Sequence, residues 1–114
     1  GIPYLAPAVN IPNRGAIPNL PADALVEVPA LVDADGLHGI CVGDLPGAIA
    51  ALCRTQVAIQ HLAVDAAMTG SRALALQALL LDPVVTNLTA AEQCLDEMLA
   101  RQAPWLPRFA GVKA

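Results

Sequence analysis

Two histidines have acidic or thiol neighbours at spacings that could support metal binding or proton transfer. His61 and Asp65 lie four residues apart, so in a helix their side chains could meet across one turn. His38 and Cys41 lie three residues apart in a segment predicted to be extended, and two residues do not make a metal site. We interpret His61 and Asp65 as a hydrogen-bonded pair on a partly exposed helix face, and we predict no metal ligand in this chain.

A polar segment near the N-terminus is the best candidate for ligand binding. It reads Asn10-Ile11-Pro12-Asn13-Arg14-Gly15 and places two amides and a guanidinium on a loop stiffened by proline. Such groups can bind sugar hydroxyls or an anion. We take Asn10, Asn13 and Arg14 as candidate contacts to a substrate or cofactor. The alternative is that they serve only the local chemistry of the loop.

Other catalytic patterns are missing from the sequence. It has no glycine-rich phosphate loop, no paired-histidine motif and no nucleophile elbow. Cys41, Cys53 and Cys94 have no short spacing, which argues against a disulfide framework or a zinc knuckle. We interpret them as buried small hydrophobic residues, and free thiols suit a reducing cytoplasm. The sequence therefore predicts no catalytic residue in this chain.

The composition is aliphatic and poor in charge. The 114 residues are 56% hydrophobic and 14% charged, with a net charge of −4. This acidic balance, with its scattered basic residues, argues against nucleic-acid binding. No uninterrupted apolar run approaches the roughly 20 residues that a membrane span requires. We therefore expect neither nucleic acid nor membrane as a partner, and we expect the excess apolar surface to be covered by a larger protein or a second copy.

The N-terminal part of the chain predicts extended structure. Residues 1–24 contain five prolines and several turn-forming residues, which predicts an extended lead rather than a helix. Residues 25–43 predict two short strands joined by a turn at 33–36. Pro29 favours an edge position or a break for the first of these strands, 25–32, because proline cannot donate a ladder hydrogen bond.

Residues 44–114 predict a helical segment that begins with one long helix. This helix should run over 45–68, with Asp44 as its N-terminal cap and Gly70 just beyond its end. It is apolar on two sides, which predicts burial on two sides.

Two shorter helices should follow. The first should run over 71–81, and the second should begin at a capping box of Thr89 and Glu92 and end near Gln102. The tail beyond Pro104 should dock two aromatic side chains, those of Trp105 and Phe109, back onto the helices. The predicted fold class is therefore α+β and mainly helical.

A series of motifs resembles, in order, the C-terminal part of glycoside hydrolase family four. This family contains α-galactosidases, α-galacturonidases and 6-phospho-glycosidases, and the resemblance covers nearly the whole chain. It implies that residues 1–114 form the C-terminal portion of a lactate-dehydrogenase-like C-terminal domain on the substrate side of the enzyme. The motifs are Asn13-Arg14-Gly15, Ile17-Pro18-Asn19-Leu20-Pro21, Val26-Glu27-Val28-Pro29, Val42-Gly43-Asp44-Leu45-Pro46 and Thr69-Gly70-Ser71-Arg72.

The resemblance also implies a chemistry. Members of this family use NAD⁺ and Mn²⁺ to oxidise C3 of the sugar, which acidifies C2 and allows elimination of the aglycone. Water then adds and C3 is reduced again. The nucleotide-binding half and the metal-binding cysteine and histidine belong to the earlier part of the family's chain, and no motif here matches them. We therefore expect a C-terminal fragment that binds neither cofactor alone and is inactive alone.

The resemblance makes the remainder of the same enzyme, or further copies of it, the expected partner, and a sugar the expected substrate. The motifs look nearer to the branch that acts on non-phosphorylated substrates. Two other hypotheses remain open. The chain could be a free-standing helical oligomerisation or interaction module without catalysis, or a small-ligand domain that uses Asn10, Asn13 and Arg14.

Overall fold

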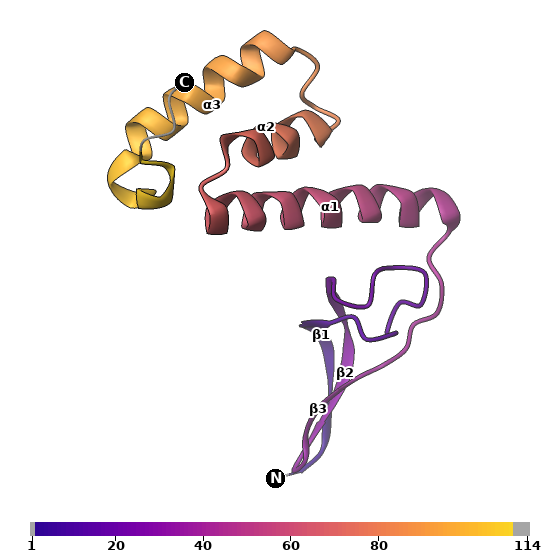
Figure 1. Cartoon of the computed structure of the whole chain (residues 1–114). Coiled ribbons are helices and arrows are strands. Elements are labelled where there is room, and N and C mark those ends of the chain that lie inside the picture. The colour runs from indigo at the N-terminus through magenta and orange to yellow at the C-terminus, as the bar shows by residue number, and fades with distance from the viewer. Residues whose placement is uncertain (1, 111–114) are drawn as a thin grey trace. The chain divides into compact units, whose positions relative to one another are not determined.

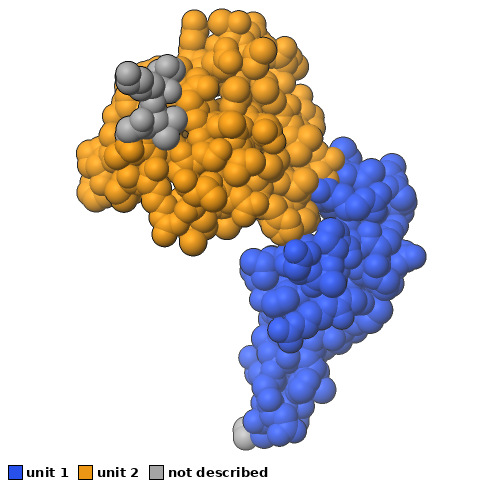
Figure 2. Space-filling view, viewed as in Figure 1, with its two compact units in different colours: residues 1–54 blue, residues 55–114 orange. Residues whose placement is uncertain are grey.

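The computed structural model describes residues 2–110 and confirms the α+β class. Three strands are followed by three α-helices and two short 3₁₀ helices (Figure 1). The chain divides into two compact units, residues 1–54 and 55–114, which Figure 2 colours separately. The division falls within the first helix, so each unit contains one part of it. No helix among the described residues is long and apolar enough to cross a membrane.

The first unit contains a three-stranded antiparallel sheet in the order β1-β2-β3. The strands are β1 (Tyr4–Pro12), β2 (Leu25–Asp33) and β3 (Gly36–Gly39). The predicted hairpin of β2 and β3 is confirmed, and the Asp35 N–H donates to Asp33 Oδ1 at 2.9 Å in its turn. The extended lead proved to be more ordered than predicted, because most of it forms β1 and pairs with β2.

The prediction that Pro29 would put its strand at the sheet edge or break it is wrong, because β2 is the central strand. Pairing with β1 shifts between Ala6↔Ala30 and Val9↔Val28, so two β1 residues lie opposite Pro29 in a bulge. On its other side, the Pro29 carbonyl accepts from Ile40 N–H at 2.9 Å, one residue beyond the end of β3. The missing N–H of Pro29 therefore lies opposite the bulge in β1 and just beyond the last residue pair of β2 and β3, where no regular strand pairing requires it.

The long helix α1 (Gly47–Thr69) begins two residues later than predicted. Asp44 is not its cap: the Ala50 N–H donates to the Pro46 carbonyl at 2.9 Å, which places Pro46 immediately before the first turn. The predicted end is confirmed. Gly70 has φ +71°, and its N–H donates to the Ala66 carbonyl, as expected for a glycine that ends a helix in the left-handed conformation.

The next two helices occupy the second unit. Helix α2 (Arg72–Leu81) starts one residue later than predicted, because Ser71 is its N-terminal cap and accepts from Leu74 N–H. Helix α3 (Leu88–Gln102) starts earlier than predicted, because Asn87 rather than Thr89 is its cap. The Asn87 Oδ1 accepts from Ala90 N–H at 3.0 Å. Asparagine and threonine are both good caps, and the chain uses the one that lies two residues upstream.

Both units have small cores built mainly from alanine and valine. In the first unit the buried apolar side chains include Val26, Val28 and Ala30 on β2, and in the second they include Ala66 and Leu95. Most of the larger aliphatic side chains remain outside these cores. A chain of this size has few elements to bury these side chains, so many of the apolar residues in the sequence lie on its surface.

Three burial predictions are corrected by this arrangement. Ile49, Leu52, Val64 and Met68 of α1 are exposed, so the helix is not buried on two sides within this chain. Cys41 and Cys94 are exposed and Cys53 is half-buried, so the cysteines are not buried core residues. In the tail, which contains the 3₁₀ helices η1 (Ala103–Trp105) and η2 (Pro107–Phe109), Phe109 is half-buried whereas Trp105 is 83% exposed and does not dock.

Candidate functional site

The loop that follows β1 is organised by one buried side chain. Asn13 is 2% exposed, and its Nδ2 donates to the carbonyls of Ile17, Leu20 and Pro21 at 2.9, 3.1 and 3.0 Å. Its Oδ1 accepts from Ile17 N–H at 2.7 Å, and its backbone N–H donates to the Ala24 carbonyl. Both ends of the amide are thus used inside the loop, which makes Asn13 a structural centre of residues 13–24.

Arg14 adopts a conformation that is rare for its residue type. It has φ +43°, in the left-handed region, and Gly15 follows with φ +94°. Its backbone N–H donates to the Ala22 carbonyl at 2.9 Å, beside the bond from the Asn13 N–H to the Ala24 carbonyl. The loop therefore holds Arg14 in place from both the backbone and the neighbouring Asn13 side chain.

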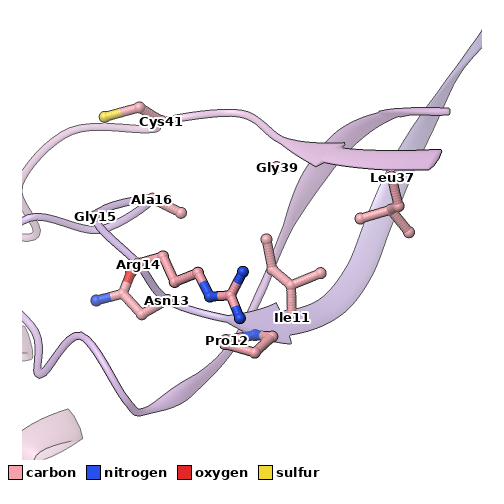
Figure 3. A pocket seen from close by; sticks show the side chains of 9 residues that line it. All are labelled: Ile11, Pro12, Asn13, Arg14, Gly15, Ala16, Leu37, Gly39 and Cys41. Carbon is pink, nitrogen blue, oxygen red and sulfur yellow. The ribbon is translucent and has the colours of Figure 1, made fainter. Parts of the chain in front are cut away.

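A hollow of about 310 Å³ lies beside this loop, and we call it the Arg14 hollow (Figure 3). The loop and the end of β1 form one part of its lining, and β3 with the segment after it forms the other. Figure 3 shows the Arg14 side chain extending toward Ile11 and Pro12, while the Asn13 amide points away from that guanidinium. The lining residues are Ile11, Pro12, Asn13, Arg14, Gly15, Ala16, Leu37, Gly39 and Cys41.

The structure brings two of the three candidate residues to this hollow. Asn13 and Arg14 line it, and Asn10 does not. Asn10 is exposed on β1, where it pairs with Glu27 of β2. The three residues are thus close in sequence but do not converge on one point, because Asn10 lies on β1 whereas Asn13 and Arg14 lie on the loop that follows it.

Asn19 is a second organising asparagine that the sequence reasoning missed. Its amide forms two hydrogen bonds with Leu45, accepting from the backbone N–H at 3.0 Å and donating to the carbonyl at 2.8 Å. The Arg54 Nη1 donates to the Asn19 carbonyl at 3.0 Å. These bonds tie the loop to the segment before α1 and to α1 itself. The signal in the sequence was the Asn-Leu-Pro motif, whose role depends on residues about 26 positions away.

The titratable side chains that the structure describes do not assemble a metal centre. Among residues 2–110, no group of three or more His, Cys, Asp and Glu side chains could hold a metal ion. His38 Nε2 lies 3.1 Å from Asp33 Oδ1 across the exposed β2–β3 hairpin. The Asp35 backbone N–H, and then His38, hold the pKa of Asp33 below its usual value. This pair serves the hairpin turn, and Cys41 lies in the lining of the Arg14 hollow.

A larger and more apolar hollow, of about 500 Å³, occupies the second unit. It is lined by side chains of α1, α2, α3 and the tail, among them Ile59, Ala78, Leu95 and Phe109. Asp82 is its one acidic lining residue. An apolar lining of this kind suits the packing of further protein rather than the binding of a sugar, whose hydroxyls require polar partners.

Comparisons with known proteins agree with this architecture. The C-terminal domain of family 4 glycosyl hydrolases matches residues 6–85. The alpha-glucosidase of Erwinia rhapontici is 48% identical over 90% of this chain and 22% of its own length, and the alpha-galactosidase of Rhizobium meliloti is 43% identical over 89% and 21%. The 6-phospho-beta-glucosidase of Thermotoga maritima, solved with manganese, NAD⁺ and glucose-6-phosphate, superimposes with a TM-score of 0.83 at 27% identity, over 91% of this chain and 25% of that one.

The chain spans about a fifth of the length of the curated relatives that it matches. The family match covers most of the chain, including β1 from Ala6 onward, β2, β3, α1 and α2. The resemblance that the motifs indicated is therefore confirmed: the chain belongs to the family 4 glycosyl hydrolases, of which it forms the C-terminal domain.

Proposed function

We propose that this chain acts as the C-terminal segment of a glycosidase that cleaves α-glycosides by NAD-dependent oxidation and elimination. Its role would be to complete the substrate-side domain and part of the oligomer interface. The observation that carries this proposal is the family match over residues 6–85 in a chain that corresponds to 22% of its α-glucosidase relative. The α-linkage is supported by the names of the two curated relatives given above, an alpha-glucosidase and an alpha-galactosidase, whereas the superimposed Thermotoga maritima structure is that of a 6-phospho-beta-glucosidase.

The described residues of this chain do not fit NAD⁺ or Mn²⁺. No cluster of metal-ligating side chains occurs among residues 2–110, and the three cysteines lie on separate elements. The sheet is antiparallel, and the sequence has no glycine-rich loop to cradle a pyrophosphate. We infer that both groups bind to parts of the enzyme outside this chain.

Of the three candidate contact residues, Arg14 is the best suited to touch a ligand. Its guanidinium lines the Arg14 hollow and carries five N–H donors. The Asn13 amide is used within the loop, and Asn10 lies outside the lining. Direct contact with substrate is therefore proposed for Arg14, and Asn10 is left as the weaker candidate.

The exposed apolar side chains support the proposed packing role. Leu52, Val64 and Met68 of α1 are each about 60% exposed, and the apolar hollow of the second unit adds further uncovered apolar surface. The burial of such surface against another protein removes it from water, which is favourable. We propose that the remainder of the same enzyme, or a second copy of it, covers these residues.

The test of the proposed function uses the complete reading frame that contains this chain. The purified protein is assayed with nitrophenyl α-glucosides and α-galactosides and their 6-phosphates, with and without NAD⁺ and Mn²⁺. We expect hydrolysis that requires both cofactors, with product formed in D₂O carrying deuterium at C2 because that position is deprotonated. Hydrolysis without NAD⁺, or product without deuterium at C2, would contradict the mechanism.

A second experiment tests the role of the 114-residue chain. Calorimetric titration of this chain with NAD⁺ and with Mn²⁺ is expected to show no saturable binding, whereas the full-length protein should bind both. Saturable binding to the short chain would overturn the assignment of the cofactor sites to other parts of the enzyme. If the protein in its source has an intact mass of 11.7 kDa, the free-standing module is supported instead.

A further inference from the structure

We propose that Arg14 binds the anionic group, phosphate or carboxylate, of a small ligand in the Arg14 hollow, and that Asn13 is the residue that positions it. The proposal deepens the proposed function, because it takes the ligand to be an acidic or phosphorylated sugar. Three observations on the loop after β1 support it. The backbone of Arg14 is strained, the buried amide of Asn13 fixes the loop in this conformation, and the described residues that line the adjacent hollow include a positively charged one and no negatively charged one.

The first observation is the backbone of Arg14. A residue with a Cβ at φ +43° is in a conformation that costs free energy, and such a conformation persists only where its surroundings impose it. Nothing in loop closure requires arginine there: glycine adopts this φ without penalty, and Gly15 already does so next to it. A strained arginine, where glycine would be relaxed, suggests that its side chain is needed.

The second observation is the set of bonds that imposes this conformation. The Asn13 amide bonds to three carbonyls and one N–H of the same loop, so residues 13–21 cannot relax independently. The backbone N–H groups of Asn13 and Arg14 donate to the carbonyls of Ala24 and Ala22 on the other side of the loop. The rigidity of the loop fixes the point from which the Arg14 side chain leaves the backbone.

The third observation is the charge in the hollow. Among the described residues that line the hollow, Arg14 is the one charged side chain, and none is Asp or Glu. The rest of the lining is apolar or glycine, apart from Asn13 and the thiol of Cys41. At about 310 Å³ the hollow lies at the small end of the range for small-molecule sites, which suits a single sugar ring with its substituent.

These features together select an anion. A guanidinium presents parallel N–H donors that match the oxygens of a phosphate or a carboxylate, and bonds to charged groups are the stronger class of hydrogen bond. A neutral sugar would leave most of these donors to water. Arg14 is thus placed to discriminate between a sugar that carries a phosphate or carboxylate and the same sugar without it.

The experiment measures ligand binding by calorimetry to the full-length protein, independently of turnover. The probes are D-glucose 6-phosphate, D-galacturonate, D-glucose and NAD⁺. We expect R14Q to bind the acidic sugars at least about tenfold more weakly, as follows from the loss of a charge-assisted hydrogen bond. R14K should recover part of the affinity, and D-glucose and NAD⁺ should bind as they do to the wild type. The control is R101Q on the exposed face of α3, which should change no affinity.

A glycine variant separates function from folding. R14G removes the strain together with the guanidinium, so we expect an unchanged or higher melting temperature and the same loss of affinity as in R14Q. For Asn13, the N13A variant should lose affinity for glucose 6-phosphate, and adding R14Q to it should cause little further loss, because both changes act on one contact. If N13A changes only the melting temperature, Asn13 does not position Arg14.

The outcomes distinguish this inference from the proposed function. If R14Q and R14G bind the acidic sugars within twofold of the wild type, or if the wild type binds none, the inference is wrong, whatever the enzyme hydrolyses. Selective weakening of NAD⁺ binding would assign Arg14 to the cofactor and also overturn it. If the acidic sugars bind in an Arg14-dependent way but no NAD-dependent hydrolysis is found, the inference stands and the proposed function fails.

Discussion

Arg72 and Asp96 join α2 to α3 through two contacts to one oxygen: the Arg72 Nε and Nη2 each lie 2.7 Å from Asp96 Oδ1. The hydrogen bond to Asp96 raises the pKa of Arg72, and the negative charge of Glu92, one turn earlier on α3, adds to this effect. The hydrogen bond from Arg72 holds the pKa of Asp96 below its usual value of 3.8. The pair is thus a polar link between α2 and α3.

The Arg72–Asp96 pair predicts a dependence of stability on pH. Because the pKa of Asp96 is lower in the folded chain than in the unfolded chain, its contribution is complete above pH 3.8 and is lost as the pH falls through the folded pKa. In urea unfolding at a series of pH values, the free energy of unfolding should fall less at acidic pH for D96N than for the wild type. E97Q, which breaks an exposed pair with Arg101, is the control and should follow the wild-type slope more closely.

Replacing Asn13 by alanine should destabilise the first unit. The N13A variant leaves the Ile17 N–H and three carbonyls of the loop without their side-chain partner, and we expect a loss of about 2–4 kcal/mol in the free energy of unfolding. The control is N10A on β1, where the amide is exposed and the change should stay within about 0.5 kcal/mol. Equal effects of the two variants in urea denaturation would contradict the structural role of Asn13.

Gly70 should tolerate no side chain. It has φ +71°, and a Cβ at this position would overlap the backbone carbonyl of Arg108, whose side chain in turn donates to the Met68 carbonyl. We expect G70A to lower the free energy of unfolding by about 1–3 kcal/mol from the backbone conformation, with a further loss from the overlap. In G47A, by contrast, the new methyl group meets open space at the start of α1, and thermal unfolding should show an unchanged or higher midpoint.

Leu52 provides a test of the proposed covering of α1. Its side chain is 61% exposed in this chain, so L52Q should change the stability of the 114-residue chain by less than about 0.5 kcal/mol. In the full-length protein, where another surface is proposed to cover it, the same change should cost on the order of 1–2 kcal/mol. Q56K on a nearby exposed turn is the control. A loss confined to the short chain would show that Leu52 is not covered by further protein.

Much of the secondary structure could be predicted from local sequence. The end of α1 at Gly70, the start of α2 at Ser71 and the hairpin turn of β2 and β3 all depend on residues within a few positions of one another. The motifs also identified the family, because their order along the chain is a property of the sequence alone.

Tertiary structure decided the rest. The strand β1 exists because it pairs with β2, and Pro29 is tolerated in a central strand because the bulge in β1 lies opposite it. The roles of the loop residues depend on where their side chains point: Asn13 turns into the loop, Arg14 lines the hollow and Asn10 lies outside it. The sequence by itself determined which residue types were present and which local turns they favour. Only the folded chain decided which of those polar groups are already hydrogen-bonded and which remain free to meet a ligand, since that depends on partners brought together from distant positions.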